Sequence, residues 1–287
     1  MISEYPGAET EPRLQTRAHS REISIEQEKE MGEVIEQAIR RAINRMYENI
    51  GEQLTIDDMA RTAMFSKFHF SRVFRQVTGV SPGRFLSAVR LQEAKRLLLS
   101  TSLSVADISN RVGYTSVGTF STRFKSSVGV APTQYRQLRG VRTDLVQNKV
   151  QDAAGHRAAT LRGKITFPQT GEPGRIFIGL FPDWIPQGAP VRSAVLSQPG
   201  PYTLTDVAPG IWYVLAHSMP HGKEDLLGDD LLADPASCVG THGPITVGPE
   251  SVTISANVNL RPMRGLDPPV LHALLDTRRS ALSAQAS

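Results

Sequence analysis

The sequence predicts a multidomain protein of the α plus β class. We expect an N-terminal all-α domain with two helix-turn-helix units, joined to a C-terminal antiparallel β-sandwich. Three observations support this fold. Apolar residues recur at helical spacing in the first half, a short motif occurs twice at one fixed offset, and the second half contains short β-prone runs separated by Pro and Gly.

Length and composition allow two domains of ordinary size. The chain has 287 residues, 40% of them hydrophobic, and a single cysteine, Cys238. One cysteine rules out an intrachain disulfide and favours a reducing compartment. No apolar run reaches the roughly 18–20 residues that span a bilayer, and residues 1–21 lack the apolar stretch of a secretory signal. We therefore expect a cytoplasmic protein without membrane association.

Positive charge is concentrated in one segment. Residues 31–142 hold 17 Lys and Arg against 8 Asp and Glu, whereas residues 160–287 hold 9 against 11. The first segment therefore has a net charge of +9 and the second −2, in a chain that carries only +4. This asymmetry suits a domain that binds a polyanion, because neutralised phosphates release condensed counterions. A basic face that is merely solvated is the alternative interpretation.

The chain begins with a segment, residues 1–22, that we predict to be a disordered tail because it lacks periodicity. From residue 23 to about residue 50, apolar side chains recur every three or four positions, with arginines on the opposite side. This pattern predicts a helix that ends at Gly51. It is the first element of a helical domain that we place at residues 23–142.

A motif containing Phe, Gly and Pro occurs twice. Six positions of the first copy have counterparts 50 residues later: Phe70 and Phe120, Phe74 and Phe124, Arg75 and Lys125, Gly79 and Gly129, Val80 and Val130, Pro82 and Pro132. Six matches at one offset indicate two copies of one supersecondary unit. A long helix from Pro82 to about Leu99 is predicted to join the copies and to set their spacing.

Each copy is predicted to contain a short supporting helix, a tight turn and a second helix. Thr55 with Asp58, and Ser104 with Asp107, resemble capping boxes in which Asp replaces Glu. The second helix has one apolar stripe and an opposite polar face. Such a helix fits the major groove of DNA, where its N-terminal side chains meet base edges. The alternative is a helical bundle whose amphipathic helices only pack together.

After residue 142 the pattern changes. Residues 143–160 are polar and small, as in a linker, and residues 161–265 form the predicted sandwich. Its β-prone runs are residues 164–167, 175–181, 202–207, 211–216, 244–247 and 252–260. Short strands with frequent Pro-Gly turns are typical of an antiparallel sandwich. Residues 266–287 are expected to form a short helix and tail.

The two copies share sequence motifs with a known family. The motifs are residues 66–75 (SKFHFSRVFR), 79–82 (GVSP) and Arg90 in the first copy, and residues 112–114 (VGY), 118–125 (GTFSTRFK) and 129–132 (GVAP) in the second. Together they resemble the AraC/XylS family of transcription regulators over about 100 residues. The resemblance implies two helix-turn-helix units in successive major-groove segments of one DNA face, about 34 Å apart. Double-stranded DNA is then the expected partner, with RNA polymerase as a second partner if the protein is an activator.

By motif position, the resemblance implies which residues meet DNA. The base-reading candidates are Phe68, Ser71 and Arg72 in the first copy and Gly118, Thr119, Thr122 and Arg123 in the second. Many family members have Arg where this chain has Thr122, and here the Arg follows one residue later. We assign phosphate contacts to Lys67, Arg75, Ser116 and Lys125. Because Gly118 has no side chain, the second helix is expected to contribute phosphate contacts and shape fit more than base specificity.

The second half also resembles a known domain. Residues 163–165, the run at 175–181 and the aromatic stretch at 201–216 resemble carboxypeptidase regulatory-like domains, which are transthyretin-like sandwiches. Such domains are usually non-catalytic, and likeness of fold does not name a ligand. In regulators of this type a second domain senses a small-molecule effector or mediates self-association, for example as a homodimer. A module whose sandwich binds protein or carbohydrate is a further alternative.

Four soft donors suggest one other function. His217 and His221 are four residues apart, as are Cys238 and His242, and such donors bind zinc. A metal-sensing regulator is one interpretation, and a solvated loop with scattered histidines is the other.

The remaining features point away from catalysis. The aromatic residues Trp184, Tyr202, Trp212 and Tyr213 either line an effector pocket or fill the sandwich core. The sequence shows no nucleophile paired with a base, no catalytic carboxylate pair and no phosphate-binding loop. We therefore expect no catalytic residues, no cofactor and no enzyme activity.

Overall fold

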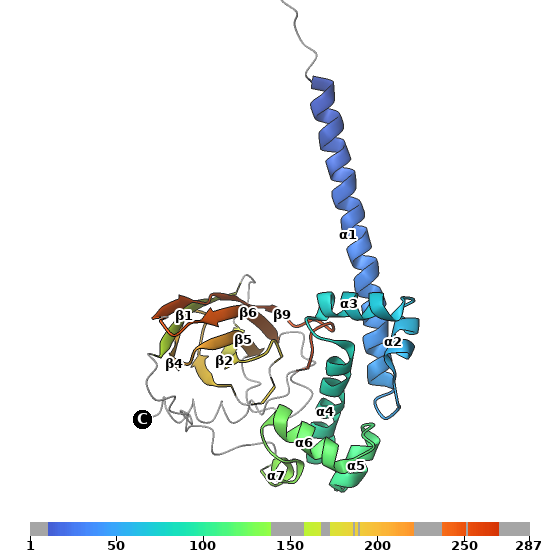
Figure 1. Ribbon diagram of the computed structural model, residues 1–287, viewed down its shortest axis with the longest axis vertical. Helices are drawn as coiled ribbons and strands as arrows, with labels where there is room; N and C mark the ends of the chain where they lie inside the picture. Colours follow the sequence, from blue (N-terminus) through green and yellow to red (C-terminus); the bar gives the residue numbers. More distant parts are fainter. Residues whose placement is uncertain are drawn as a thin grey trace, which may run out of the picture.

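The computed structural model describes residues 11–138, 158–167, 173–185, 187–188, 190–220, 237–250 and 252–269. Helices form the first part of this chain and strands the second, and the two parts lie side by side (Figure 1). Within the described ranges, no helix combines the length and the apolar character needed to cross a bilayer.

The helical domain contains α1 (Glu11–Glu48), α2 (Ile56–Thr62), α3 (Lys67–Thr78), α4 (Pro82–Ser100), α5 (Val105–Arg111), α6 (Val117–Val128) and α7 (Pro132–Gln137). The predicted helix start at residue 23 is wrong, because α1 begins twelve residues earlier and projects away from the other helices (Figure 1). Residues 11–22 lack apolar periodicity but are rich in good helix formers, so a helix propagates through them from its packed end. The predicted disordered tail is therefore wrong for residues 11–22, and residues 1–10 lie outside the described part of the chain.

The repeat is confirmed as two copies of one unit. Phe70 and Phe74 of the first copy are fully buried with ring centroids 5.4 Å apart, and Phe120 and Phe124 of the second are fully buried with centroids 5.7 Å apart. After each of these helices the chain turns through a glycine with a left-handed backbone, at φ 79° and 96°. Only glycine adopts this conformation without strain, which explains why it recurs at the same place.

Helix α4 joins the two units, as predicted. Phe85 and Val89 belong to the core around α1–α3, whereas Leu91 and Leu98 belong to the core around α5–α7. One continuous helix thus contributes to both cores. Because it is shared, the two units are held in one fixed spatial relation.

The predicted capping boxes are present at both supporting helices. Thr55 and Asp58 bond each other's backbone N–H groups at the start of α2, and Ser104 and Asp107 do so at the start of α5. The hydrogen bonds from the Thr55 hydroxyl and backbone hold the pKa of Asp58 below its ordinary value. Ser66 and Ser116 cap α3 and α6 through their hydroxyls alone, which accept the backbone N–H groups of His69 and Thr119. These four helices therefore begin where local side-chain chemistry directs them to begin.

Two arginines hydrogen-bond the backbone of the loops that precede the supporting helices α2 and α5. Arg90 donates to the carbonyl oxygens of Ile50 and Glu52 at 3.1 and 2.6 Å. In the second unit, Arg136 donates to two carbonyls, those of Leu98 and Leu103, at 3.1 and 2.6 Å. Each guanidinium satisfies backbone acceptors that lie at the end of one helix and before the next.

We expect Arg90→Lys to lower the free energy of unfolding by about 1 kcal/mol, because an ammonium keeps the charge but cannot span both carbonyls. Urea denaturation followed by helical circular dichroism measures the effect. Arg61→Lys is the control, since Arg61 is exposed and its ion pair with Asp58, at 3.5 Å, lies on the surface. Equal stabilities of the two variants would contradict this role.

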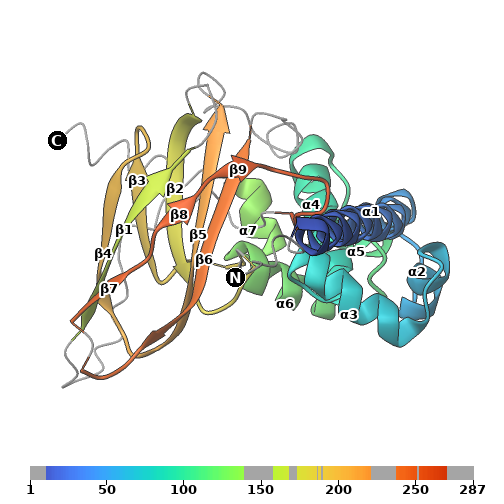
Figure 2. The ribbon, with the colours of Figure 1, turned by 90° about the horizontal axis from the view of Figure 1, so that it is seen from above.

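The β domain contains β1 (Ala159–Thr166), β2 (Pro173–Phe181), β3 (Arg192–Leu196), β4 (Pro201–Val207), β5 (Gly210–Pro220), β6 (Cys238–Val247), β7 (Thr253–Ser255), β8 (Val258–Asn259) and β9 (Arg261–Pro262). One sheet has the order β4-β1-β7, with β8 also paired to β1, and the other has the order β3-β2-β5-β6-β9. Side chains of both sheets, among them Leu161 and Ile178, share one core. The helical domain lies beside the five-stranded sheet (Figure 2).

Three sequence expectations about this domain need correction. Pairing is not wholly antiparallel, because β7 and β8 run parallel to β1. The chain reaches them from the other sheet and not through a hairpin, which removes the geometric demand for antiparallel pairing. Strand β3 was not predicted, since apolar and polar residues do not alternate clearly in its sequence. The predicted linker at 143–160 is wrong at its end because β1 begins at Ala159, and residues 139–157 lie outside the described ranges.

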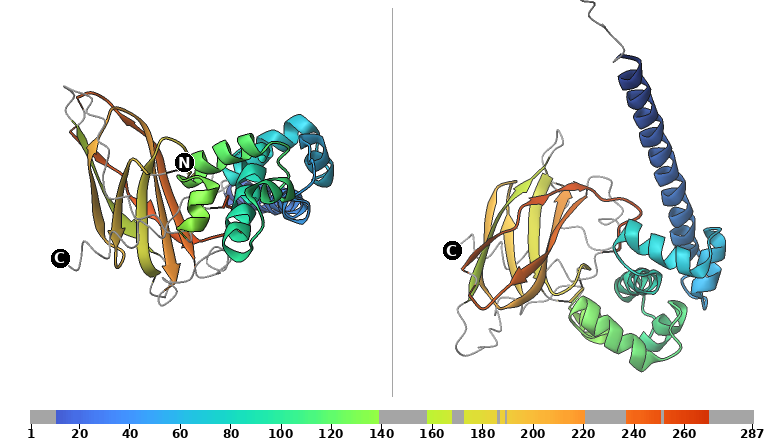
Figure 3. Two further views of the ribbon diagram at one scale, coloured as in Figure 1. Left: turned by 90° about the horizontal axis from the view of Figure 1, so that it is seen from below. Right: turned by 45° about the horizontal axis from the view of Figure 1, so that its top comes forward.

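Just beyond the boundary predicted at residue 265, the chain packs on the helical domain. Leu266 is fully buried in the core around α1–α3, and Ile185, from the segment after β2, is buried in the same core. Figure 3 shows the chain passing from the sheet to the helices in two views. Residues 270–287, where a short helix and tail were expected, lie outside the described residues.

Candidate nucleic-acid interface

Helix α3 presents an exposed face that carries the predicted residues of the first unit. Phe68 is 87% exposed although it is a large apolar side chain, and Arg72, one turn further on, is also exposed. Ser71 is half-buried between them. The buried residues of α3 belong to its other side, and Phe68 is not among them. An exposed Phe beside an exposed Arg is what a surface that binds another molecule presents.

Two of the first unit's cations already have neighbours. Lys67 pairs with Asp57 at 3.0 Å, and an Arg72 guanidinium nitrogen lies 3.3 Å from Nδ1 of His69. Both contacts are exposed, so they orient the side chains at little cost and are easily exchanged for a phosphate or a base. Neither His69 nor Asp57 is among the site residues predicted from the sequence. His69 precedes Arg72 by three residues on α3, a spacing that the sequence shows, whereas Asp57 lies in the first turn of α2 and no local pattern links it to Lys67.

Helix α6 presents the corresponding face of the second unit. Gly118, Thr119, Thr122 and Arg123 line one shallow depression, so the structure brings together the four base-reading candidates predicted there. Lys125 is exposed beyond them. The depression is open, as a surface that receives an extended ligand must be.

Ser116 has a structural role as well as its predicted phosphate contact. Its hydroxyl oxygen accepts the backbone N–H of Thr119 at 3.4 Å and so caps α6. The hydroxyl proton stays available to donate outward. Ser116 is also exposed, which is the condition that a phosphate contact needs.

The two faces differ in size at equivalent positions. An offset of 50 aligns Phe68 with Gly118 and Arg72 with Thr122. Helix α3 thus carries an aromatic ring and a guanidinium group at these two positions, whereas α6 carries no side chain at the first and only a small hydroxyl side chain at the second. By contrast, both helices have a cation at a third equivalent position, Arg75 in α3 and Lys125 in α6. Large side chains able to contact bases are therefore found on α3, and each helix has one cation at the equivalent position.

The four candidate metal ligands do not come together among the residues that the structure describes. Cys238 packs in the core between the sheets, whereas His217 lies on the opposite face of the same sheet, and His242 directs Nδ1 at the Asn257 carbonyl oxygen, 2.8 Å away. Burial raises the pKa of the Cys238 thiol, which disfavours the thiolate that a metal requires. In the described ranges, no three His, Cys, Asp or Glu side chains are grouped so that they could hold a metal ion, and His221 lies outside these ranges.

Of the aromatic residues predicted to fill the core or to line a pocket, some do the first and some the second. Tyr202 is buried in the core, where its hydroxyl donates to the Ala256 carbonyl and burial raises its pKa. Trp212 packs against the same core and donates its Nε1–H to a backbone carbonyl. Trp184 instead lines a pocket, with Tyr213 edge-on at 5.7 Å.

Comparisons with known proteins concern the helical segment. Residues 59–138 match the helix-turn-helix domain family. The chain is 35% identical over 88 residues to the HTH-type transcriptional activator AarP of Providencia stuartii, which covers 31% of this chain and 65% of the relative. It is 28% identical over 104 residues to the lactose operon transcription activator of Staphylococcus xylosus, covering 36% and 37%. The chain thus spans less than two thirds of both curated relatives.

Among solved structures, a transcriptional regulator with an AraC-type DNA-binding domain from Chromobacterium violaceum is 30% identical in sequence. The match covers 36% of this chain and 93% of that chain, with a TM-score of 0.35. The family match, the two regulators and the duplicated unit all fall on one segment. Residues 59–138 are therefore a helix-turn-helix domain of the AraC type.

Proposed function

We propose that this protein is a sequence-specific DNA-binding transcription regulator in which α3 and α6 enter adjacent segments of the major groove. The observation that carries the proposal is the duplication: each helix ends one copy of the same unit, exposes its polar face, and is tied to the other copy by α4. The relatives named above are described as transcription activators, which supports the same function.

Each face has its own role in the proposal. Arg72 donates two hydrogen bonds to a guanine edge, and Phe68 contacts a thymine methyl group. Thr119 contacts a second thymine methyl, while Thr122 and Arg123 bind at the groove wall. Lys67, Arg75, Ser116 and Lys125 bind phosphates. Specificity then comes mainly from α3, with α6 setting register and shape fit.

Selection of bound sequences from random duplexes tests this function. We expect an asymmetric motif with two parts about one helical turn apart, the part under α3 being better defined. The competing function, an interaction module in which the helices serve only assembly, predicts no enrichment. It also predicts no steep loss of duplex affinity with rising salt.

Lys125→Gln should weaken binding to all duplexes alike and reduce the slope of log affinity against log salt by about one. The reason is that one phosphate contact fewer releases one counterion fewer. Fluorescence anisotropy over a salt series measures the slope. Lys164→Gln is the matched control, because Lys164 is an exposed lysine on β1 of the β domain. A loss restricted to the selected sequence would contradict a phosphate role for Lys125.

For the β domain we propose a carboxypeptidase regulatory-like sandwich that senses a small-molecule effector. The two sheets around one core support the sandwich, although β7 and β8 depart from antiparallel pairing. Its direct packing on the DNA-binding domain supports sensing, because an effector can act only through a physical connection.

A further inference from the structure

The segment after β2 contacts the ends of both DNA-binding helices. Trp184 packs against Gly79, which ends α3, so closely that a Cβ at Gly79 would lie 2.3 Å from the indole Nε1. Four residues later, the Gly188 N–H donates to the carbonyl oxygen of Ser127 in the last turn of α6, at 2.6 Å. Between them, Ile185 is buried in the core around α1–α3. We call Asp183–Ile185 with Gln187–Gly188 the bridging segment.

The segment after β9 forms a second connection between the β domain and the helical domain. Beyond β9 the chain inserts Leu266 into the same helical core, and Arg264 lies 3.9 Å from Glu36 of α1. On the first side, Asp183 of the bridging segment pairs with Arg84 of α4 at 2.6 Å. The β domain therefore contacts the helices in two regions, one on each side of the C-terminal end of α3.

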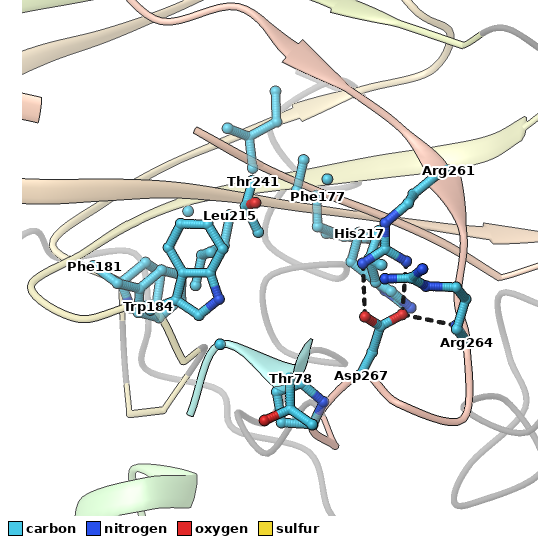
Figure 4. Close-up of a pocket in the computed structure, with 18 of the residues that line it drawn as sticks. Thr78, Phe177, Phe181, Trp184, Leu215, His217, Thr241, Arg261, Arg264 and Asp267 are labelled. Atoms are coloured by element: carbon cyan, nitrogen blue, oxygen red, sulfur yellow. Dashed lines mark hydrogen bonds and ion pairs between the residues drawn. The ribbon is translucent and has the colours of Figure 1, made fainter. Parts of the chain in front are cut away.

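A pocket of 240 Å³ lies between these two connections. Its floor is the outer face of the five-stranded sheet, with Phe177 and Leu215, and its roof is the end of α3 at residues 76–79. Figure 4 shows Trp184 and Phe181 at one end and the charged side chains at the other. Since a cavity of about 150 Å³ holds benzene, this pocket holds a molecule of roughly ten non-hydrogen atoms.

The charged end has an excess of cations. The Asp267 carboxylate accepts hydrogen bonds from two guanidinium nitrogens of Arg261, at 2.7 and 2.6 Å, and from the backbone N–H of Arg264, at 2.7 Å. This bonding raises the pKa of Arg261 and occupies the carboxylate of Asp267. Glu36 and Arg40 of α1 are outside the pocket lining: Glu36 lies 3.9 Å from Arg264, and Arg40 lies 3.3 Å from where a Cβ on Gly265 would be. The ionised side chains that line the pocket are therefore two cations, Arg261 and Arg264, and one anion, Asp267.

We propose that this pocket is a binding site for a small apolar acid, whose hydrocarbon part lies against Trp184, Phe177 and Leu215 and whose anionic group meets Arg264. This proposal rests on the proposed DNA-binding function for its consequence, but not for the binding itself. Aromatic and aliphatic walls remove the hydrocarbon from water, and the excess positive charge selects an anion.

Occupation of the pocket acts on the DNA-binding helices through Trp184. The indole lines the pocket and packs on the end of α3, and its segment also holds the end of α6. A ligand that shifts this segment changes the relation between the two helices that must enter successive grooves. Linkage requires the converse: DNA changes the affinity for the acid by the same factor.

Binding is tested with phenylacetate and octanoate, two acids of about ten non-hydrogen atoms, and with phenylacetamide as the uncharged counterpart of the first. The chain has two tryptophans, so Trp212→Phe makes emission report on Trp184 alone. We expect saturable changes in emission with both acids and weaker binding of the amide. The melting temperature of the unaltered protein, raised by any ligand of the native state, gives the same affinity order independently.

Arg264→Gln should weaken binding of the acids about tenfold and leave the amide unchanged, because a charge-assisted contact is lost. Arg162→Gln is the matched control, since Arg162 is an exposed arginine on β1 of the other sheet. The proposal is overturned if neither acid changes Trp184 emission or melting temperature, or if Arg264→Gln binds the acids as wild type does.

DNA affinity is then measured with and without saturating acid. We expect it to change at least fivefold, and acid affinity to change equally when DNA is bound. An unchanged affinity overturns the coupling. Failure to bind any duplex both with and without acid contradicts the proposed function instead, and leaves the acid-binding measurements standing.

Discussion

Phe124→Ala is expected to lower the free energy of unfolding of the helical domain by about 3–5 kcal/mol, the usual cost of truncating a buried Phe. The Phe124 ring is fully buried, with the rings of Phe120 and Tyr135 at 5.7 and 5.5 Å. Its removal leaves a cavity among rigid aromatic neighbours that cannot collapse into it. Urea denaturation followed by far-ultraviolet circular dichroism measures the loss.

Two further Phe→Ala variants make this prediction specific. Phe74→Ala should cost a similar amount, because Phe74 occupies the equivalent position and meets Phe85 edge-on at 5.5 Å. Phe68→Ala should change stability by less than about 0.5 kcal/mol, since its ring is 87% exposed. A Phe124→Ala variant as stable as Phe68→Ala would refute the assignment of the stripe to the core.

Arg72→Ala is expected to weaken binding to the selected duplex by about 1–3 kcal/mol, while binding to an unrelated duplex falls much less. The exposed guanidinium projects from the first half of α3, where a helix in the major groove meets base edges. Its planar fork matches two acceptors on guanine, so the loss should be confined to one or two base pairs. Anisotropy titrations against single-substitution duplexes locate them.

The control for Arg72→Ala must remove the same charge without touching α3. Arg162→Ala does so, since Arg162 is exposed on β1. Thr122→Ala, at the equivalent position of α6, should have the smaller effect on specificity because a hydroxyl offers one contact where a guanidinium offers two. Equal losses on selected and unrelated duplexes for Arg72→Ala would mean that Arg72 contacts only phosphate.

Local interactions explain which parts of the fold were predictable. The capping pairs at Thr55 and Ser104 and the glycines after α3 and α6 act within a few residues of their own position, so their spacing is readable in the chain. The start of α1 was misplaced because helix propagation depends on length and propensity, which apolar periodicity does not report. Strand β3 was missed because its five residues show no clear alternation of apolar and polar side chains, and only its pairing with β2 identifies it as a strand.

The candidate DNA interface could be predicted because it is a repeated local unit. The exposed positions of Phe68 and Arg72 follow once the buried stripe is known, since the opposite side of a short helix faces outward. The proposed metal site did not follow in this way. Spacing of four residues placed His217 near His221 in sequence, yet pairing of β5 with β6 directs His217 and Cys238 to opposite faces of one sheet.

The sequence by itself determined the two helix-turn-helix units, their caps and their apolar stripes, because each depends on contacts between residues close together in the chain. Only the tertiary structure decided how the β domain is attached. Ile185 and Leu266 complete a core that begins more than a hundred residues earlier, and the pocket between them combines the end of α3, five strands and the segment after β9. No periodicity marks such residues, because the partners that bury them are distant in sequence and meet only when both domains have folded.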